Sequence, residues 1–257
     1  MRTIYSKDNK LYKLCRELHE RRGRKKHGLF LIEGEKLTAE ALLEGVSLYA
    51  LIVREGCEEI AAGEDKTPLY ACFSEQLFAE AAQTESPQAL MAVCEIPERL
   101  SREEFEGKLK GRSAVVLDRL QDPGNVGTII RTAEAAGMGG VVLVKGTSDV
   151  WALKTVRAAA GSLLRMPLYF AEDAEDAALI AKDLGLPLAV SELSGDSLSY
   201  EELAGPALIV IGNEGGGISE DFIRLSDIRI HIPMRGKVES LNAAIAAALI
   251  MYGINKK

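Results

Sequence analysis

Short apolar runs alternate with helix-patterned segments along most of the chain. In its first part, apolar runs at residues 29–34, 48–54 and 89–96 are separated by segments with helical spacing at 36–45 and 73–83. Runs of this length, bounded by turn residues, are typical of strands, and the longer periodic segments are typical of helices. The alternation predicts a small α/β domain over residues 1–95.

A second and more regular alternation begins near Ser113. Its apolar runs are rich in Val, Ile and Leu and show no polar alternation, and they lie at residues 113–118, 140–144, 186–192, 207–213 and 228–233. Strands buried on both faces of a mostly parallel sheet have this character. The pattern predicts an α/β domain over residues 113–257, with helices covering the sheet. Pro97 and the charged stretch that follows it predict a linker at residues 96–112.

The last helix is apolar on nearly every side. Ser240 is expected to cap it, and apolar residues then recur at helical spacing: Leu241, Ala244, Ile245, Ala248, Leu249 and Tyr252. The opposite face is mostly alanine, and helices of this kind are normally covered on more than one side. Two interpretations are open, namely burial against the sheet and a homodimer interface.

The composition indicates a globular protein with a substantial core. The chain has 257 residues, of which 47% are hydrophobic, yet no apolar run approaches the roughly 18 residues that a membrane span needs. The N-terminal sequence does not resemble a signal peptide, so a cytoplasmic location is expected. The four cysteines and three histidines are scattered, which predicts neither a disulfide framework nor a metal site.

The charge is unevenly distributed. The chain carries a net −7, but residues 1–28 hold three acidic residues and ten basic ones, a net +7 that leaves −14 for the rest. The basic residues of this arm are Arg2, Lys7, Lys10, Lys13, Arg16, Arg21, Arg22, Arg24, Lys25 and Lys26. A basic arm on an acidic body suits a polyanion such as RNA, since phosphate neutralisation is local. The arm is expected to begin as a helix that ends in a turn between Gly23 and Gly28, and a solvated charged helix is the alternative to RNA binding.

Three segments rich in glycine and asparagine follow predicted strands. They read DPGNVGTIIR at residues 122–131, IGNEGGGIS at 211–219 and IPMRGKVESLN at 232–242. Parallel α/β sheets bind ligands beyond the carboxyl ends of their strands, where strand order reverses. Glycines there let backbone approach a ligand closely, and the polar side chains have no packing reason to cluster. The segments therefore predict a ligand site.

Common nucleotide-binding patterns are absent from the sequence. None of the three segments contains G-x-G-x-x-G after a first strand, and the pattern G-x-x-x-x-G-K-[ST] occurs nowhere. These patterns are the signatures of dinucleotide-binding folds and phosphate-binding loops. Both ordinary NAD binding and P-loop ATP binding are disfavoured.

The three segments, in this order, resemble the signature motifs of the SpoU (TrmH-type) family of RNA ribose 2′-O-methyltransferases, which belongs to the SPOUT class. The stretch at 156–167 is similar to a fourth region of that family. The resemblance covers about residues 113–257 and implies a C-terminal domain with a trefoil knot that binds S-adenosylmethionine. Periodicity alone would have predicted an unknotted sheet.

The N-terminal part carries a second resemblance. The segment FLIEGEKLTAEAL at residues 30–42 is similar to the RNA substrate-binding domain that often precedes the methyltransferase domain in this family. The resemblance implies that residues 1–95, with their basic helix, bind structured RNA.

The resemblance also implies the residues of the donor pocket. Gly212, Ile232 and Leu241 match positions whose backbone surrounds the adenosine of S-adenosylmethionine. Main-chain amides and carbonyls suit adenine, because they offer a donor and an acceptor together. Three further residues are assigned to the same pocket: Gly217, Met234 and Ser240.

Four residues match the polar positions implied in catalysis: Asn125, Arg131, Glu214 and Asn242. The family's arginine is implicated in activating the ribose hydroxyl, but a guanidinium stays protonated and is a poor base. A role in orienting the 2′-oxygen or the adjacent phosphate is preferred, on a helix face that Arg131 is expected to share with Asn125. An ion pair with Glu134 is the structural alternative for Arg131. Ser240 and Asn242 suit helix capping as well as the site.

The implied function is a homodimeric, S-adenosylmethionine-dependent ribose 2′-O-methyltransferase that acts on ribosomal RNA and needs no metal. Three alternatives are kept: a non-catalytic RNA-binding or ribosome-assembly factor on the same fold, a transfer RNA ribose methyltransferase, and a base methyltransferase. The choice of ribosomal RNA rests on the two-domain layout and is an analogy with other members of the family.

Overall fold

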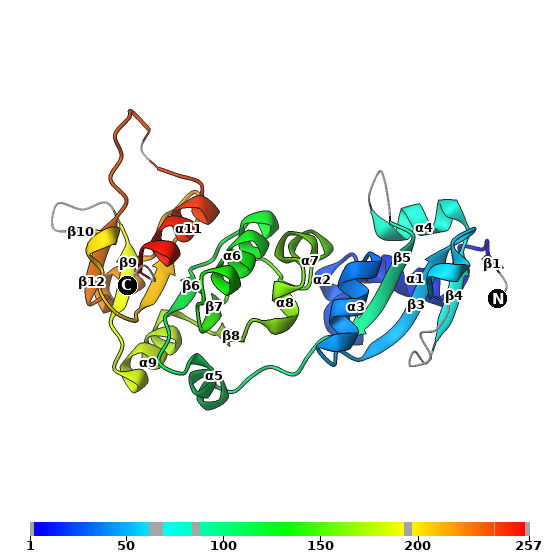
Figure 1. Ribbon diagram of the computed structural model, residues 1–257, viewed down its shortest axis with the longest axis horizontal. Helices are drawn as coiled ribbons and strands as arrows, with labels where there is room; N and C mark the ends of the chain where they lie inside the picture. Colours follow the sequence, from blue (N-terminus) through cyan, green and yellow to red (C-terminus); the bar gives the residue numbers. More distant parts are fainter. Residues whose placement is uncertain (1–2, 62–68, 84–87, 193–196, 239, 255–257) are drawn as a thin grey trace. The chain divides into compact units, whose positions relative to one another are not determined.

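The structure is a computed structural model that describes residues 3–61, 69–83, 88–192, 197–238 and 240–254. The chain divides into two compact units (Figure 1). Unit 1 combines Met1–Glu98 with Asp149–Leu164, and unit 2 combines Arg99–Ser148 with Arg165–Lys257. Each unit contains one sheet and its own covering helices.

Unit 1 has a mixed five-stranded sheet in the order β1-β4-β3-β5-β2. Its strands are β1 (Thr3–Ile4), β2 (Leu29–Glu33), β3 (Leu48–Arg54), β4 (Tyr70–Phe73) and β5 (Leu90–Glu95). β5 runs antiparallel to both β2 and β3, while β3 and β4 are parallel. The three longer strands were predicted from their apolar runs. The prediction missed β1 and β4, which have only two and four residues.

Six helices and one 3-10 turn belong to this part of the structure: α1 (Lys10–Glu17), α2 (Arg21–His27), α3 (Glu35–Leu43), η1 (Glu58–Ala61), α4 (Glu75–Ala82), α7 (Leu153–Ala159) and α8 (Ser162–Arg165). The turn expected between Gly23 and Gly28 is wrong, because the chain is helical up to His27. A Cβ atom at Gly23 would lie 1.9 Å from the Glu17 carbonyl oxygen. This glycine therefore allows α2 to approach the end of α1.

The basic arm separates into structural and free cations. Arg24 is buried, donates to Asp149 Oδ2 from Nε at 2.9 Å and donates to the Leu18 and His19 carbonyls from Nη1. Lys7, Lys13 and Lys26 form exposed ion pairs with carboxylates, and Arg16 donates to the Glu80 carbonyl. Arg2 lies outside the described residues. The cations that remain without a partner among the described residues are Lys10, Arg21, Arg22 and Lys25.

Helices α7 and α8 pack with unit 1, although the linear pattern groups them with residues 113–257. The rings of Trp151 and Phe30 lie 4.8 Å apart, and Leu153 joins the apolar core of unit 1. Arg157 pairs with the buried carboxylate of Glu33. The stretch expected to be a linker is also partly structured, because α5 (Arg102–Leu109) begins there with a capping box between Ser101 and Glu104.

Unit 2 has a seven-stranded sheet in which every recorded pairing is parallel. Its strands are β6 (Ala114–Leu117), β7 (Gly140–Val144), β8 (Leu168–Ala171), β9 (Leu188–Ser191), β10 (Leu198–Ser199), β11 (Leu208–Ile211) and β12 (Ile228–His231). The order is β10-β12-β9-β11-β6-β7-β8. The predicted parallel sheet is confirmed; β8 and the two-residue β10 were not predicted.

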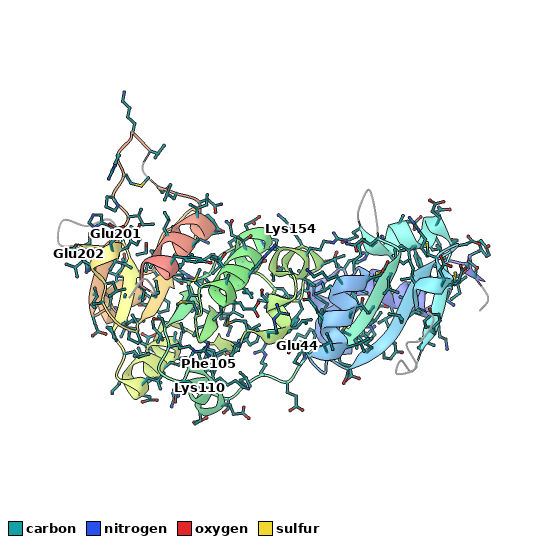
Figure 2. The ribbon with its side chains drawn as sticks, viewed as in Figure 1. Glu44, Phe105, Lys110, Lys154, Glu201 and Glu202 are labelled. Carbon is teal, nitrogen blue, oxygen red and sulfur yellow. The ribbon has the colours of Figure 1, made fainter. Side chains whose placement is uncertain are left out.

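The remaining elements cover this sheet (Figure 1). They are α5, α6 (Pro123–Ala135), α9 (Ala174–Leu184), η2 (Tyr200–Glu202), α10 (Glu220–Leu225) and α11 (Ala243–Ile254). α6 packs against α11, and α9 packs against both α5 and α10. Figure 2 labels Phe105 on α5 and Lys110 just beyond it. A Cβ at Gly140 would lie 2.5 Å from the Phe105 ring, so the glycine lets α5 seat this ring on the sheet. None of the described helices is long and apolar enough to cross a membrane.

Helix α11 is buried on one side only. The buried side consists of Ala243, Ala244, Ala247, Ile250, Met251 and Ile254. The other side exposes apolar residues, with Ile245 54%, Leu249 38% and Tyr252 50% accessible. The apolar face that the spacing predicted, from Leu241 to Tyr252, is therefore mainly the exposed side of the helix. The side that packs against α6 and the sheet is largely the alanine-rich one.

The strand order reverses between β6 and β11. From β6 the chain proceeds outward through β7 and β8, and the later strands β9, β11 and β12 lie on the other side. The carboxyl ends of β6 and β11 are adjacent, with Leu117 opposite Ile211. This is the position at which open parallel sheets bind ligands.

Candidate functional site

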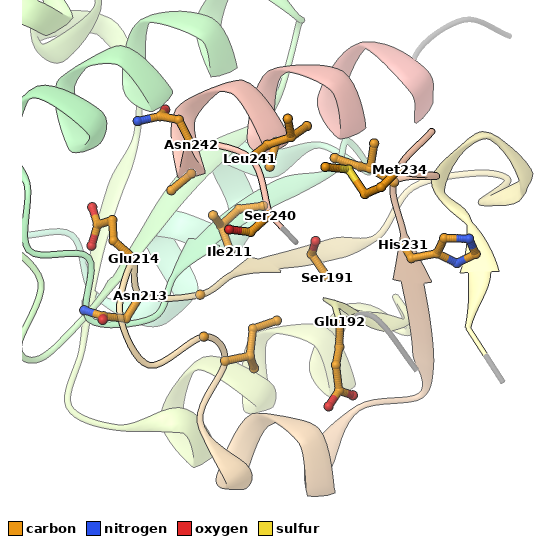
Figure 3. A pocket seen from close by; sticks show the side chains of 16 residues that line it. Ser191, Glu192, Ile211, Asn213, Glu214, His231, Met234, Ser240, Leu241 and Asn242 are labelled. Carbon is orange, nitrogen blue, oxygen red and sulfur yellow. The ribbon is translucent and has the colours of Figure 1, made fainter. Parts of the chain in front are cut away.

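A pocket lies at the carboxyl ends of β9, β11 and β12. Its volume is about 600 Å³, and it opens between the loop after β11 and the start of α11 (Figure 3). All six residues assigned to the donor pocket from the sequence line it: Gly212, Gly217, Ile232, Met234, Ser240 and Leu241. The two later motifs therefore form one cavity.

Gly212 allows the loop after β11 to close. A Cβ atom there would lie 2.5 Å from the backbone carbon of Gly217 and 2.5 Å from the Ile218 nitrogen. Asn213 and Gly217 exchange two backbone hydrogen bonds of 2.9 Å across the same loop. The Asn213 side chain accepts hydrogen bonds from the Gly215 and Gly216 amides and donates to the Arg119 carbonyl. The tight loop thus brings its backbone to the pocket wall.

Three segments of the pocket wall present unpaired main-chain groups. The N–H and C=O groups of Gly212, Ile232 and Leu241 have no hydrogen-bond partner among the described residues, although all three residues are half-buried. Shielded backbone groups are normally paired. Ile211, Ile232, Met234 and Leu241 supply apolar walls beside these groups. The combination suits a flat heterocycle that both donates and accepts hydrogen bonds, as adenine does.

The Glu214 carboxylate links the loops after β6 and β11. It accepts hydrogen bonds from the backbone amides of Gln121 at 3.1 Å and Asp122 at 3.3 Å, and from Asn125 Nδ2 at 3.0 Å. Asp122 is the N-cap of α6 and accepts from the Asn125 amide at 2.8 Å. One carboxylate of the second motif therefore holds the start of the first.

Asn242 connects the third motif to the same network. Its Nδ2 donates to Asn125 Oδ1 at 3.0 Å, and its Oδ1 accepts from the Ala244 and Ile245 amides at 2.9 and 3.3 Å. Asn242 is thus the capping residue of α11, and the expectation that Ser240 caps this helix is wrong, since α11 begins only at Ala243. The capping interpretation of Asn242 is confirmed by its side-chain oxygen, while its amide nitrogen bonds Asn125 and its part in the site stays a prediction.

Arg131 lies apart from the pocket. It is exposed on α6 and does not line the cavity. The prediction that Arg131 shares a helix face with Asn125 is wrong. The six-residue step between them advances the helix by about 1.7 turns, which leaves the two side chains about 120° apart around the axis. The ion pair with Glu134 is also absent among the described residues: Glu134 pairs with Arg165, and Arg131 has no recorded partner.

Hydrogen bonding keeps Glu214 ionised. Burial raises the pKa of this carboxyl, but hydrogen bonds from Asn125 and from backbone amides, including those of Gln121 and Asp122, outweigh burial and hold its pKa below the ordinary 4.5. A group with a lowered folded pKa contributes stability above its unfolded pKa and loses this contribution as pH falls through the folded value. The network should therefore persist throughout the neutral range.

A pH series can test this network. We expect Glu214→Gln to lower the free energy of unfolding by about 1 kcal/mol at pH 7, a small value because the side chain is exposed. The difference between wild type and variant should stay constant down to about pH 5 and shrink below the ordinary Glu pKa of 4.5. Denaturant unfolding at each pH measures it. A difference that changes between pH 8 and pH 6 would contradict the assignment.

Sequence reasoning missed several residues of the wall. Ser191 ends β9 and Glu192 follows it, His231 ends β12, and Asn213 stabilises the loop after β11. Figure 3 shows these side chains around the cavity. The rule that ligands bind at strand carboxyl ends could have identified Glu192, because the predicted strand 186–192 ends on it. Among the described residues, no group of three or more His, Cys, Asp or Glu side chains could hold a metal ion.

Comparisons with known proteins agree with this geometry. The SpoU rRNA Methylase family matches residues 112–252, and the MRM3-like substrate binding domain matches residues 9–92. The Bacillus subtilis 23S rRNA (guanosine(2553)-2′-O)-methyltransferase RlmP is 33% identical, covering 98% of each chain. A Streptomyces viridochromogenes 23S rRNA (uridine(2479)-2′-O)-methyltransferase is 30% identical, covering 98% of this chain and 91% of the relative.

Solved structures show the same architecture. The AdoMet-bound rRNA methyltransferase from Sinorhizobium meliloti superimposes with a TM-score of 0.87 at 31% identity, covering 98% of this chain and 96% of that one. The family predicted from three short motifs is confirmed. With matches over nearly its whole length, the chain belongs to the SpoU rRNA methylase family.

Proposed function

We propose that this protein is an S-adenosylmethionine-dependent methyltransferase that modifies the ribose 2′-oxygen of ribosomal RNA. The observation that carries the proposal is the pocket at the carboxyl ends of β9, β11 and β12, where unpaired backbone groups from two loops lie beside the Glu214–Asn125–Asn242 network. Relatives named as 23S rRNA 2′-O-methyltransferases support the choice of reaction and of RNA class.

The pocket residues suit the donor. S-adenosylmethionine supplies a methyl group on a positively charged sulfur, so neither a metal nor a covalent enzyme intermediate is required. The backbone of Gly212, Ile232 and Leu241 would hydrogen-bond the adenine, and Met234 would cover its face. Gly217 and Ser240 complete the wall. The protein's main task in this reaction is to position the donor relative to the ribose oxygen.

Asn125 and Asn242 have positioning roles in this proposal. The Asn125 amide is used at both ends, donating to Glu214 and accepting from Asn242. This fixes its orientation, and it also ties the N-terminus of α6 to the N-terminus of α11. Glu214 holds the network together by accepting these hydrogen bonds. Its lowered pKa keeps the carboxylate ionised at neutral pH, so that both oxygens stay acceptors.

Arg131 is proposed to act on the RNA side. A guanidinium keeps its proton, so it would orient and stabilise the 2′-oxygen or hold the neighbouring phosphate through paired N–H groups. The lack of a protein partner for Arg131 among the described residues leaves all of its donors available.

A homodimer through α11 would account for its exposed apolar face. Ile245, Leu249 and Tyr252 leave one side of the helix uncovered. On α6, which packs with α11, Thr128, Arg131 and Ala135 form an exposed stripe. An interface that covers both helices would place Arg131 beside the partner subunit. Exposed apolar patches of this kind commonly mark such contacts.

A charge placed on this face should separate the subunits. We expect Leu249→Glu to convert the dimer to a monomer in light scattering, because burying an unpaired carboxylate is strongly unfavourable. Leu179→Glu on α9 is the matched control, since Leu179 is 39% exposed and Leu249 is 38% exposed. A Leu249→Glu protein that remains dimeric would exclude α11 from the interface.

The free cations of unit 1 are proposed to bind the RNA. Arg21, Arg22 and Lys25 lie on α2 without partners among the described residues, in the part that matches the MRM3-like substrate binding domain. Phosphate contacts of this kind position an RNA without reading its sequence.

Methyl transfer from labelled donor tests the proposal. Purified protein should label ribosomal RNA that lacks the modification, with transfer RNA as the comparison. Labelling of transfer RNA alone would favour the transfer RNA alternative. RNA binding without donor binding or label transfer would favour the non-catalytic factor.

A further inference from the structure

The segment between β12 and α11 carries two cations beside the donor pocket. The motif-three loop, defined here as residues 233–238, leaves the body of unit 2 after β12 (Figure 1). Met234 lines the pocket, as do Ile232 before the loop and Leu241 after it. Arg235 and Lys237 do not line it, and both are exposed. The loop thus contributes one residue to the donor pocket and two cations to its surroundings.

These two cations lie in a part of the chain where acidic residues outnumber basic ones. From Arg165 to the C-terminus the sequence holds fourteen acidic and eight basic residues. Arg165, Arg224 and Arg229 each pair with a carboxylate. Arg235 and Lys237 form no hydrogen bond or ion pair with any residue that the structure describes. Two like charges separated only by Gly236 repel each other, so a polyanionic partner would stabilise this arrangement.

We propose that Arg235 and Lys237 bind the RNA phosphates that flank the target ribose. This rests on the proposed function, since the ribose must reach the methyl donor in the pocket beside the loop. A ribose in RNA has a phosphate on each side, and Lys and Arg side chains bind phosphates while releasing counterions. The contacts orient the target nucleotide but do not read its base.

The proposal assigns an anion-binding role to the loop and differs from two other roles. A loop that covers the donor would change donor affinity when its cations are removed. A loop that contacts a second copy of the chain would change the oligomeric state. Phosphate binding changes neither, and its distinguishing property is a dependence of RNA affinity on salt.

The double variant Arg235→Gln/Lys237→Gln tests the assignment in the full-length protein. Lys108→Gln/Lys110→Gln is the matched control, because it removes the same charge from exposed residues of unit 2. Those lysines line a separate cavity with Arg112 and Pro167, at the amino ends of the strands. Three quantities are measured for each protein: RNA affinity from 50 to about 300 mM salt, donor affinity by calorimetry, and mass by light scattering.

We expect the loop variant to bind ribosomal RNA roughly tenfold more weakly at low salt and to show a shallower salt dependence. For single-stranded contacts the slope of log K against log salt falls by about 0.7 for each lost phosphate, or about 1.4 for two. Donor affinity and mass should match wild type, and the loss should appear in KM for RNA more than in kcat. The control should keep the wild-type slope.

An unchanged slope in the loop variant would overturn the assignment, as would an equal change in the control. Reduced donor affinity with normal RNA binding would make the loop a cover for the donor, and a change in mass would make it a subunit contact. Wild-type protein that neither binds RNA nor transfers methyl groups would contradict the proposed function itself. That failure is distinguishable, because it appears before any substitution is made.

Discussion

Gly212→Ala is expected to lower donor affinity about a hundredfold or more and to destabilise unit 2 by about 1–3 kcal/mol, the usual range for overpacking. The added methyl would lie 2.5 Å from two backbone atoms of Gly217 and Ile218. Backbone cannot move aside as a flexible side chain can, so the loop must open. Opening it displaces the unpaired Gly212 groups and the paired amides of Asn213 and Gly217.

Gly215→Ala provides the control in the same loop. A Cβ there meets only Asn213 Oδ1, at 3.7 Å, and Gly215 does not have a positive φ. The two alanine variants therefore differ mainly in the room for the methyl group. Calorimetry with donor and denaturant unfolding would measure both effects. Donor affinity in Gly212→Ala equal to that of Gly215→Ala would contradict the assigned pocket.

Arg131→Ala is expected to slow methyl transfer about 10²–10³-fold, about 2.7–4 kcal/mol, as when one donor to a developing negative charge is removed. Donor affinity and unfolding free energy should stay near wild type, because Arg131 does not line the pocket and alanine suits an exposed helix position. Single-turnover transfer from bound donor to saturating RNA measures the step.

Arg131→Lys separates charge from geometry. Lysine keeps the positive charge but lacks the planar pair of N–H donors, so partial recovery would indicate charge and no recovery would indicate bidentate contact. If Arg131→Ala transfers methyl groups at the wild-type rate, Arg131 has no role in the reaction. If it lowers donor affinity as well, the arginine helps to form the pocket.

The site could be predicted from the sequence to a large extent. Gly212, Ile232 and Leu241 lie in segments that directly follow apolar runs, and a parallel sheet brings the ends of such runs to one edge. All six predicted donor residues line one cavity, and Asn125, Glu214 and Asn242 form one hydrogen-bonded network. Their roles in binding and catalysis stay predictions that the variants above can test.

Other features depend on contacts between distant residues, which periodicity does not record. Helix α7 packs with unit 1 because Trp151 meets Phe30 and Arg157 meets Glu33, 121 and 124 residues away. Gly23 resembled a turn residue, but its role is close helix contact with Glu17. The trefoil knot concerns the path of the whole chain, and it stays an expectation from the family resemblance.

Local ambiguities were resolved by individual hydrogen bonds. Ser240 and Asn242 are both good capping residues, and only the bonds from the Ala244 and Ile245 amides identify Asn242 as the cap. The spacing of Arg131 from Asn125 implied one helix face, whereas the exact helical repeat separates them. Glu134 was the alternative partner considered for Arg131, and it pairs with Arg165 instead.

The most direct test of the central claim is the chemical position of the transferred methyl group. Purified protein would be incubated with methyl-labelled S-adenosylmethionine and ribosomal RNA, and the RNA would be digested to nucleosides and separated. We predict that the label appears in a 2′-O-methylated nucleoside and is lost in Gly212→Ala. The account would be contradicted if the label appeared on a base. It would also be contradicted if the protein bound both the donor and the RNA but transferred no label.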